Sequence, residues 1–79
     1  MKSKVPVGEI IVNVEVDGSV VLNKAVVSLP DLFDRLSRIA KGFPDQAVIL
    51  RSHEDTEFQY VVDVLDQIKK AGINNVITI

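Results

Sequence analysis

The sequence predicts an α+β domain, a two-layer αβ sandwich in which two helices pack on one face of a mixed sheet. Three observations support this class. Residues 9–16 alternate between two sets of side chains, as a half-buried strand does. Two later segments, 28–42 and 56–72, carry apolar side chains at helical spacing, and each is followed by a short apolar run, at 46–51 and 75–79. The predicted order is β-β-(β)-α-β-α-β.

The first predicted strand runs from Glu9 to Val16. Asp17-Gly18 then favours a type I′ turn, because both of its central residues need positive φ. Ser19–Asn23 returns as a second strand, and Lys24–Val27 is either a short third strand or the approach to a helix. On one side of the first strand we expect Ile10, Val12, Val14 and Val16, and on the other Glu9, Ile11, Asn13 and Glu15.

The first helix is expected to start with Ser28 as N-cap, with Pro30 and Asp31 in its first turn. Gly42 suits a left-handed C-cap, and Pro44 prevents continuation. The predicted apolar stripe consists of Leu29, Leu32, Phe33, Leu36, Ile39 and Ala40.

The exposed side of this helix is expected to carry ion pairs. Asp31–Arg35 and Asp34–Arg38 are opposite charges four residues apart. Together with Lys41 the arginines form a weak basic strip, which the interleaved aspartates mark as a solvated surface.

Residues 46–51 predict a central strand covered on a face. Thr56 and Gln59 then predict a capping box at the start of the second helix, and Gly72 suits a left-handed cap at its end. A final strand follows at 75–79, and both later strands are expected to run parallel to a neighbour. The second apolar stripe consists of Phe58, Val61, Val62, Leu65 and Ile68.

The chain has 79 residues, which suffice for one small domain. We expect residues 1–8 to form a flexible leader and residues 9–79 a single domain. There is no Cys for a disulfide, so close packing or dimerisation must supplement a small core. The net charge of −2 and pI near 5.2 provide no footprint for nucleic acid. No apolar run reaches transmembrane length.

No constellation of residues predicts a catalytic, cofactor or metal site. The run 53–55 (His-Glu-Asp) holds the single His, and no second group of ligands completes it, so a solvated loop is expected. Asp63 and Asp66 face Lys69 and Lys70 at helical spacing, which predicts a salt-bridged surface. We therefore expect a binding module that is not an enzyme.

The outer side of the first strand is the candidate partner-binding site: Glu9, Ile11, Asn13 and Glu15. A long alternating strand beside a leader is expected to be an edge, which accepts a strand from a second subunit or a partner peptide. The alternative is an ordinary edge guarded by Glu9 and Glu15.

Two stretches together resemble the periplasmic domain of the ExbD/TolR biopolymer transport family. Residues 14–23 (VEVDGSVVLN) are similar to its first hairpin. Residues 47–79 (AVILRSHEDTEFQYVVDVLDQIKKAGINNVITI) are similar to its ending. The chain departs from the family at Ser52-His53, where Ala-Asp is frequent, and at Phe58, where Tyr is frequent.

The resemblance implies a short cytoplasmic start and one transmembrane helix with a proton-handling aspartate, neither of which is in this sequence. It also implies a homodimer in the periplasm. The implied partners are an ExbB/TolQ-type channel and a TonB- or TolA-type transducer, and TolR-like members contact peptidoglycan. Two alternatives remain: a cytosolic small-molecule-binding regulatory domain of ferredoxin-like or ACT-like order, and an acylphosphatase-like hydrolase. The latter needs an Arg-bearing anion loop at a helix start, where this chain has Asp31 and Glu57.

Overall fold

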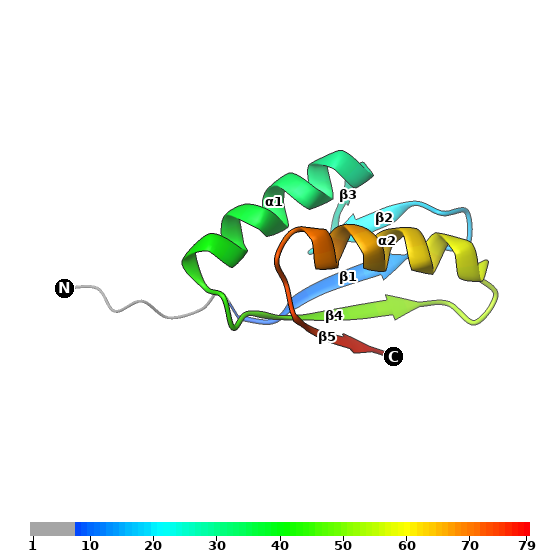
Figure 1. The fold of residues 1–79 in the computed structure, drawn as a ribbon. Helices are drawn as coiled ribbons and strands as arrows, with labels where there is room; N and C mark the ends of the chain where they lie inside the picture. The colour runs from blue at the N-terminus through cyan, green and yellow to red at the C-terminus, as the bar shows by residue number, and fades with distance from the viewer. Residues whose placement is uncertain (1–7) are drawn as a thin grey trace.

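The computed structural model describes residues 8–79 and confirms the α+β class (Figure 1). The leader predicted at residues 1–8 lies, except for Gly8, outside the described residues. The elements are β1 Ile10–Val14, β2 Val20–Leu22, β3 Ala25–Val27, α1 Leu29–Gly42, β4 Ala47–Ser52, α2 Phe58–Lys70 and β5 Asn75–Thr78. The uncertain third strand is therefore present as β3.

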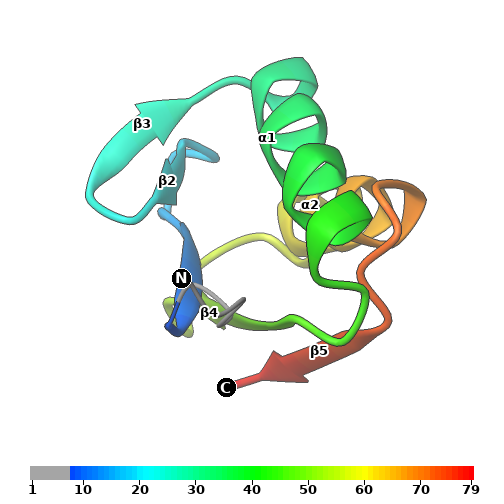
Figure 2. The same cartoon turned by 90° about the vertical axis from the view of Figure 1, so that its left-hand side faces the viewer.

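Both helices lie on one side of the five-stranded sheet and pack against each other (Figure 2). The strand order is β3-β2-β1-β4-β5. β1, β2 and β3 pair antiparallel, whereas β4 is parallel to both β1 and β5, as predicted. Because side chains alternate along a strand, every second residue faces the helices. The core consists of Ile10, Val12, Val14, Val20, Leu22, Val27, Leu32, Leu36, Val48, Leu50, Val64, Ile68, Ala71 and Ile73.

The first strand is the centre of the sheet, and the prediction that it forms an edge is wrong. β1 pairs with β2 on one side, with Asn13 opposite Val21. On the other side it pairs with β4, with Asn13 opposite Arg51. A long alternating strand signals one covered face, but its pattern holds no information about its neighbours. Strand addition to β1 is thereby excluded, because its backbone groups are already paired.

The two hairpin turns reverse the expected turn chemistry. The loop between β1 and β2 contains Val16, Asp17 and Gly18, and only Gly18 has positive φ, at 93°. Gly18 N–H donates to Glu15 O, and Glu15 N–H donates to Ser19 O, so this is a three-residue loop with a bulge rather than a type I′ turn. The predicted strand thus ends at Val14, and Val16, expected on the same side as Ile10, Val12 and Val14, is 50% exposed.

The positive φ angles of a type I′ turn occur instead between β2 and β3. Asn23 has φ 47° and Lys24 has φ 76°, although neither is glycine. The Asn23 carboxamide oxygen accepts the Ile11 N–H at 3.2 Å, and Asn23 N–H donates to Ile11 O. This pair of bonds ties the second turn to β1, which explains how two side-chain-bearing residues hold a conformation that glycine prefers.

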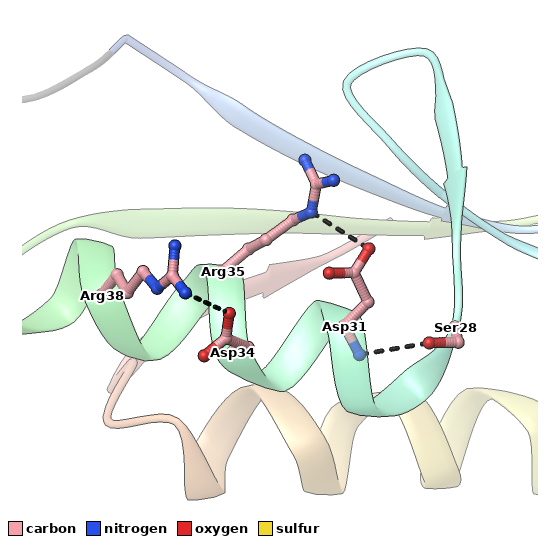
Figure 3. A network of polar contacts seen from close by, with 5 residues as sticks. All are labelled: Ser28, Asp31, Asp34, Arg35 and Arg38. Carbon is pink, nitrogen blue, oxygen red and sulfur yellow. Dashed lines mark hydrogen bonds and ion pairs between the residues drawn. The ribbon is translucent and has the colours of Figure 1, made fainter.

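The start of α1 confirms its predicted cap and ion pairs (Figure 3). Ser28 Oγ accepts the Asp31 N–H at 3.2 Å. Arg35 pairs with Asp31 at 3.1 Å and Arg38 with Asp34 at 2.9 Å, all largely exposed. The C-cap prediction is wrong, because the helix includes residue 42 and Phe43 is the cap, at φ −137°. Of the predicted stripe, Phe33 is 37% exposed.

The predicted capping box of α2 does not form. The N-cap is Glu57 without a side-chain hydrogen bond. Thr56 Oγ1 instead donates to Val14 O at 3.4 Å, and Gln59 Nε2 donates to Asp63. The helix starts one residue later than predicted, and Phe58, its first residue, is 79% exposed and lies outside the core. The left-handed cap is confirmed, because Gly72 follows the C-cap at φ 103°.

Candidate interaction surface

The face of the sheet opposite the helices carries a row of three isoleucines. Ile11 of β1 is paired with Ile49 of β4, which in turn is paired with Ile77 of β5. Ile11 and Ile49 are half-buried, and Ile77 is 53% exposed. Residues in register on adjacent strands point to the same face. The three side chains therefore form a continuous apolar stripe, which we call the isoleucine row.

A second row on the same face is mixed in character. Asn13 lies between Val21 of β2 and Arg51 of β4, and Val21 is paired with Val26 of β3. Val26 is 74% exposed. The open face thus presents apolar groups on both sides of a polar centre, a composition typical of a surface that meets another protein.

The structure brings together only part of the predicted partner-binding set. Ile11 and Asn13 are two residues apart in β1 and both point to the open face. Each is half-buried and lies between buried residues of the strand. Glu9 precedes the strand, and Glu15 follows it in the loop, and both are exposed. The four residues mark the open face at one central strand rather than an edge. Their role in partner binding stays a prediction.

β5 is one of the two real edges of the sheet. Ile79 N–H donates to Leu50 O of β4 at 3.0 Å. Because backbone groups of successive residues point to opposite sides of a strand, those of Val76 and Thr78 point away from β4, to the free edge. Asn75–Thr78 contains no charged residue and no proline. Charge and proline, two of the devices that commonly guard an edge, are therefore missing from this strand.

Two of the depressions on the open face have a bearing on binding. The first, about 330 Å³, is lined by Gly8, Glu9, Asp45, Gln46, Ala47, Ile49 and Ile77. Gln46 is 6% exposed, and its Nε2 donates to Gly8 O and Ala47 O at 3.0 Å. Among residues 8–79 its Oε1 meets no donor. The second, about 390 Å³, is lined by Ile11, Asn13, Asn23, Lys24 and Arg51.

The polar groups singled out in the sequence do not converge on a reactive centre. His53 and Asp55 are exposed, and Asp55 N–H donates to His53 Nδ1 at 3.2 Å. Asp66 pairs with Lys70 at 3.1 Å, which confirms a salt-bridged helix surface, whereas Asp63 accepts from Gln59. Within residues 8–79 no three His, Cys, Asp or Glu side chains come together as metal ligands would.

Among residues 8–79 one titratable group is clearly perturbed, and it lies in the first hairpin loop. The pKa of Asp17 is lowered, first because its carboxylate accepts the Ser19 N–H at 2.9 Å, with further help from the Ser19 hydroxyl. Asp17 is exposed to solvent. The perturbation stabilises a turn and does not create a proton-transfer site.

The sequence model of the biopolymer transport protein ExbD/TolR family matches residues 2–78, nearly the whole chain. The chain belongs to the ExbD/TolR family. A comparison with individual curated proteins gave no match. No helix in residues 8–79 has both the length and the apolar character needed to cross a membrane.

ExbD/TolR membership places this domain among subunits of biopolymer transport complexes, a transport-associated class rather than an enzyme class. The two stretches that resembled the family form the first hairpin loop with β2, and β4–α2–β5. Together they supply β2, β4 and β5 of the sheet and only the last residue of β1. Sequence reasoning missed the isoleucine row. The alternation of side chains within β1, β4 and β5 was the available signal for which residues point outward. Whether those residues are adjacent depends on the order of the strands in the sheet, which the alternation does not give.

Proposed function

We propose that this chain is the periplasmic assembly module of an ExbD/TolR-type subunit in a complex of the Ton/Tol type driven by the proton-motive force. In this proposal the domain forms a homodimer through the free edge of β5 and contacts the energy transducer with its open face. The observation that carries the proposal is an edge strand without charge or proline, β5, in a chain of this family. The channel subunit of the ExbB/TolQ type is the membrane partner that the family suggests.

The edge of β5 supports pairing between two copies. Val76 and Thr78 direct their backbone N–H and C=O groups outward, and an antiparallel twin strand would satisfy all of them. Ile77 and Ile79 are 53% and 70% exposed, so pairing would also cover apolar surface. In a two-fold pair the two sheets would become continuous, and the isoleucine row of each copy would extend into the other.

Proline substitution tests this edge without touching the monomer's own ladder. Thr78→Pro removes a free-edge N–H, while the bond from Ile79 to Leu50 is retained. The expected result in sedimentation equilibrium is a monomer where the unsubstituted domain shows a monomer–dimer equilibrium.

The matched control lies on the opposite edge. Glu15 N–H donates to Ser19 O, and Asn23 N–H donates to Ile11 O. The backbone N–H and C=O groups of the odd-numbered residues of β2 therefore point toward β1. Val26, paired with Val21, then directs its N–H outward from β3. Val26→Pro is expected to leave the dimer intact. A dimer that survives Thr78→Pro and is lost with Val26→Pro would assign the interface to β3 and overturn the proposal for β5.

The assignment to a Ton/Tol-type complex has a separate test in the gene. We expect the coding sequence upstream of residue 1 to contain one transmembrane segment bearing an aspartate. An open reading frame that begins at Met1 and stands without any such segment would refute the periplasmic, membrane-anchored assignment.

The regulatory-domain alternative makes a different prediction, a thermal shift with a metabolite. Binding at 100 times Kd adds about 2.7 kcal/mol to stability. The depressions described above are open to solvent and hold no enclosed cavity, which favours a protein-contacting surface over a small-molecule pocket.

A further inference from the structure

We infer that the depression between the β2–β3 turn and β4 is a binding site for a carboxylate borne by an acidic protein segment with an apolar residue beside it. This inference is independent of the β5 dimer. It rests on the lining of the depression by Ile11, Asn13, Asn23, Lys24 and Arg51. Of this set the sequence pattern drew attention only to Ile11 and Asn13, because its members come from three separate segments.

Two cations meet in this depression without an anion between them. Arg51 is opposite Asn13 on the open face, and Lys24 is presented by the adjoining turn. Within residues 8–79 neither Arg51 nor Lys24 forms an ion pair or a side-chain hydrogen bond, unlike Arg35 and Arg38. A guanidinium fork and an ammonium that converge on one hollow are suited to a carboxylate, which accepts from both.

The turn that presents Lys24 holds this residue in an unfavourable backbone conformation. Lys24 has φ 76°, a conformation that side-chain-bearing residues rarely adopt, and Asn23 ties the turn to β1 through two hydrogen bonds with Ile11. Strain of this kind is commonly kept where a side chain is needed in place. The Asn23 carboxamide oxygen is occupied by Ile11, so its NH₂ group remains as a donor for an incoming oxygen.

The floor of the depression determines the rest of the ligand. Ile11 belongs both to the depression and to the isoleucine row, so a group beside the bound carboxylate lies against apolar surface. A free inorganic anion cannot use that surface. Glu15 lines an adjoining hollow together with Arg51, so its carboxylate competes for the guanidinium. An acidic segment with an apolar neighbour therefore matches the site better than a phosphate.

The test is an NMR titration of the domain at low ionic strength with acetyl-Leu-Glu-amide, compared with the neutral isostere acetyl-Leu-Gln-amide and with inorganic phosphate. Both peptides are too short to add a strand. We expect saturable shifts of the amide resonances of Asn13, Asn23, Lys24 and Arg51 with the Glu peptide, and affinity at least roughly tenfold weaker for the Gln peptide.

Variants assign the effect to the two cations. Arg51→Gln and Lys24→Gln should each weaken Glu-peptide binding roughly fivefold to tenfold, whereas Glu15→Gln should strengthen it roughly twofold. The matched control is Lys69→Gln, an exposed cation on α2, which should change nothing. Retained dispersion of the NMR spectrum shows that each variant is folded. If Arg51→Gln does not fold, Lys24→Gln alone decides whether the cations bind the carboxylate.

Several results would overturn the site. Equal affinity for the Glu and Gln peptides would remove the carboxylate requirement. Equal loss with Lys69→Gln would show unspecific charge attraction. Phosphate bound more tightly than the Glu peptide would make the site a general anion site, and shifts centred on Val76 and Thr78 would move binding to the edge of β5.

Discussion

The two faces of the sheet are both rich in apolar side chains, but only one is covered. On the helix side, Val12, Val48 and Leu50 are at most 1% exposed. On the open side, Ile77 is 53% and Val26 is 74% exposed. The first face accounts for the fold of the monomer, because its burial needs only α1 and α2. The second adds little to that fold in the isolated domain, and its apolar rows are therefore available to a partner.

The same kind of truncation on the two faces of one strand should have very different costs in stability. Leu50 and Ile49 are neighbours in β4 and point to opposite sides. Leu50→Ala should lower the free energy of unfolding by about 2–5 kcal/mol, because it leaves a cavity beneath the helices. Ile49→Ala should lower it by about 1 kcal/mol, because it removes partly solvated surface.

Urea denaturation of both variants measures the difference directly. Equal losses would show that the open face is as important to the monomer as the covered one. In the dimer assay of the β5 edge, by contrast, Ile49→Ala is expected to have the larger effect relative to its cost in stability, because it lies in the isoleucine row.

The covered face was largely predictable from the sequence, and the open face was not. Helix stripes and the alternation of β1 assign inward residues locally, since periodicity needs no knowledge of neighbours. The position of β1 in the sheet depends on long-range pairing with β4, which no local pattern contains. The isoleucine row and the depression beside Arg51 both depend on that pairing, so they remained invisible.

The turns show a second limit, in which two local signals compete. Asp17-Gly18 satisfies the composition of a type I′ turn, but the Asp17 carboxylate accepts the Ser19 N–H and favours the three-residue loop instead. The opposite holds at Asn23-Lys24, where bonds to Ile11 impose positive φ on a lysine. A local side-chain hydrogen bond decides the first case, and hydrogen bonds to a neighbouring strand decide the second. Similarly, the Thr56 hydroxyl contacts Val14 O rather than capping α2.

Gly18 lies close to Tyr60 of α2. Its replacement should cause the next largest loss in the free energy of unfolding. A Cβ at Gly18 would lie 3.1 Å from the ring of Tyr60 of α2, and φ is 93°. Gly18→Ala should destabilise the domain by about 2 kcal/mol, from the left-handed backbone and the displaced ring. Thermal and urea unfolding measure the loss.

The matched control is Gly42→Ala at the end of α1, where a Cβ meets nothing within 4 Å and φ is not positive. There alanine should be neutral or stabilise the helix by up to about 1 kcal/mol. Opposite signs at the two glycines are the expected outcome, and losses of the same size at both would contradict the assigned contact with Tyr60.

Beside the open face, Lys24 is held in a strained backbone conformation with positive φ. Lys24→Gly should stabilise the domain by about 1 kcal/mol, because glycine adopts the positive φ without the Cβ penalty. The same change should weaken binding of acetyl-Leu-Glu-amide, because it deletes one of the two cations. Stabilisation with unchanged peptide affinity would show that Lys24 holds the turn for no reason connected with the carboxylate.

The smallest expected effect on stability is at Asp17, in the loop between β1 and β2. Its pKa in the folded domain is below that of the unfolded chain, because the charged form accepts the Ser19 N–H. The carboxylate therefore stabilises the fold above the unfolded pKa, and this contribution is lost as pH falls through the folded pKa. Asp17→Asn keeps an acceptor for Ser19 without the charge. The stability difference between the two proteins should thus be present at neutral pH and shrink in acid. A difference independent of pH would mean that the neutral hydrogen bond alone shapes the loop, and that charge has no part in choosing it over a type I′ turn.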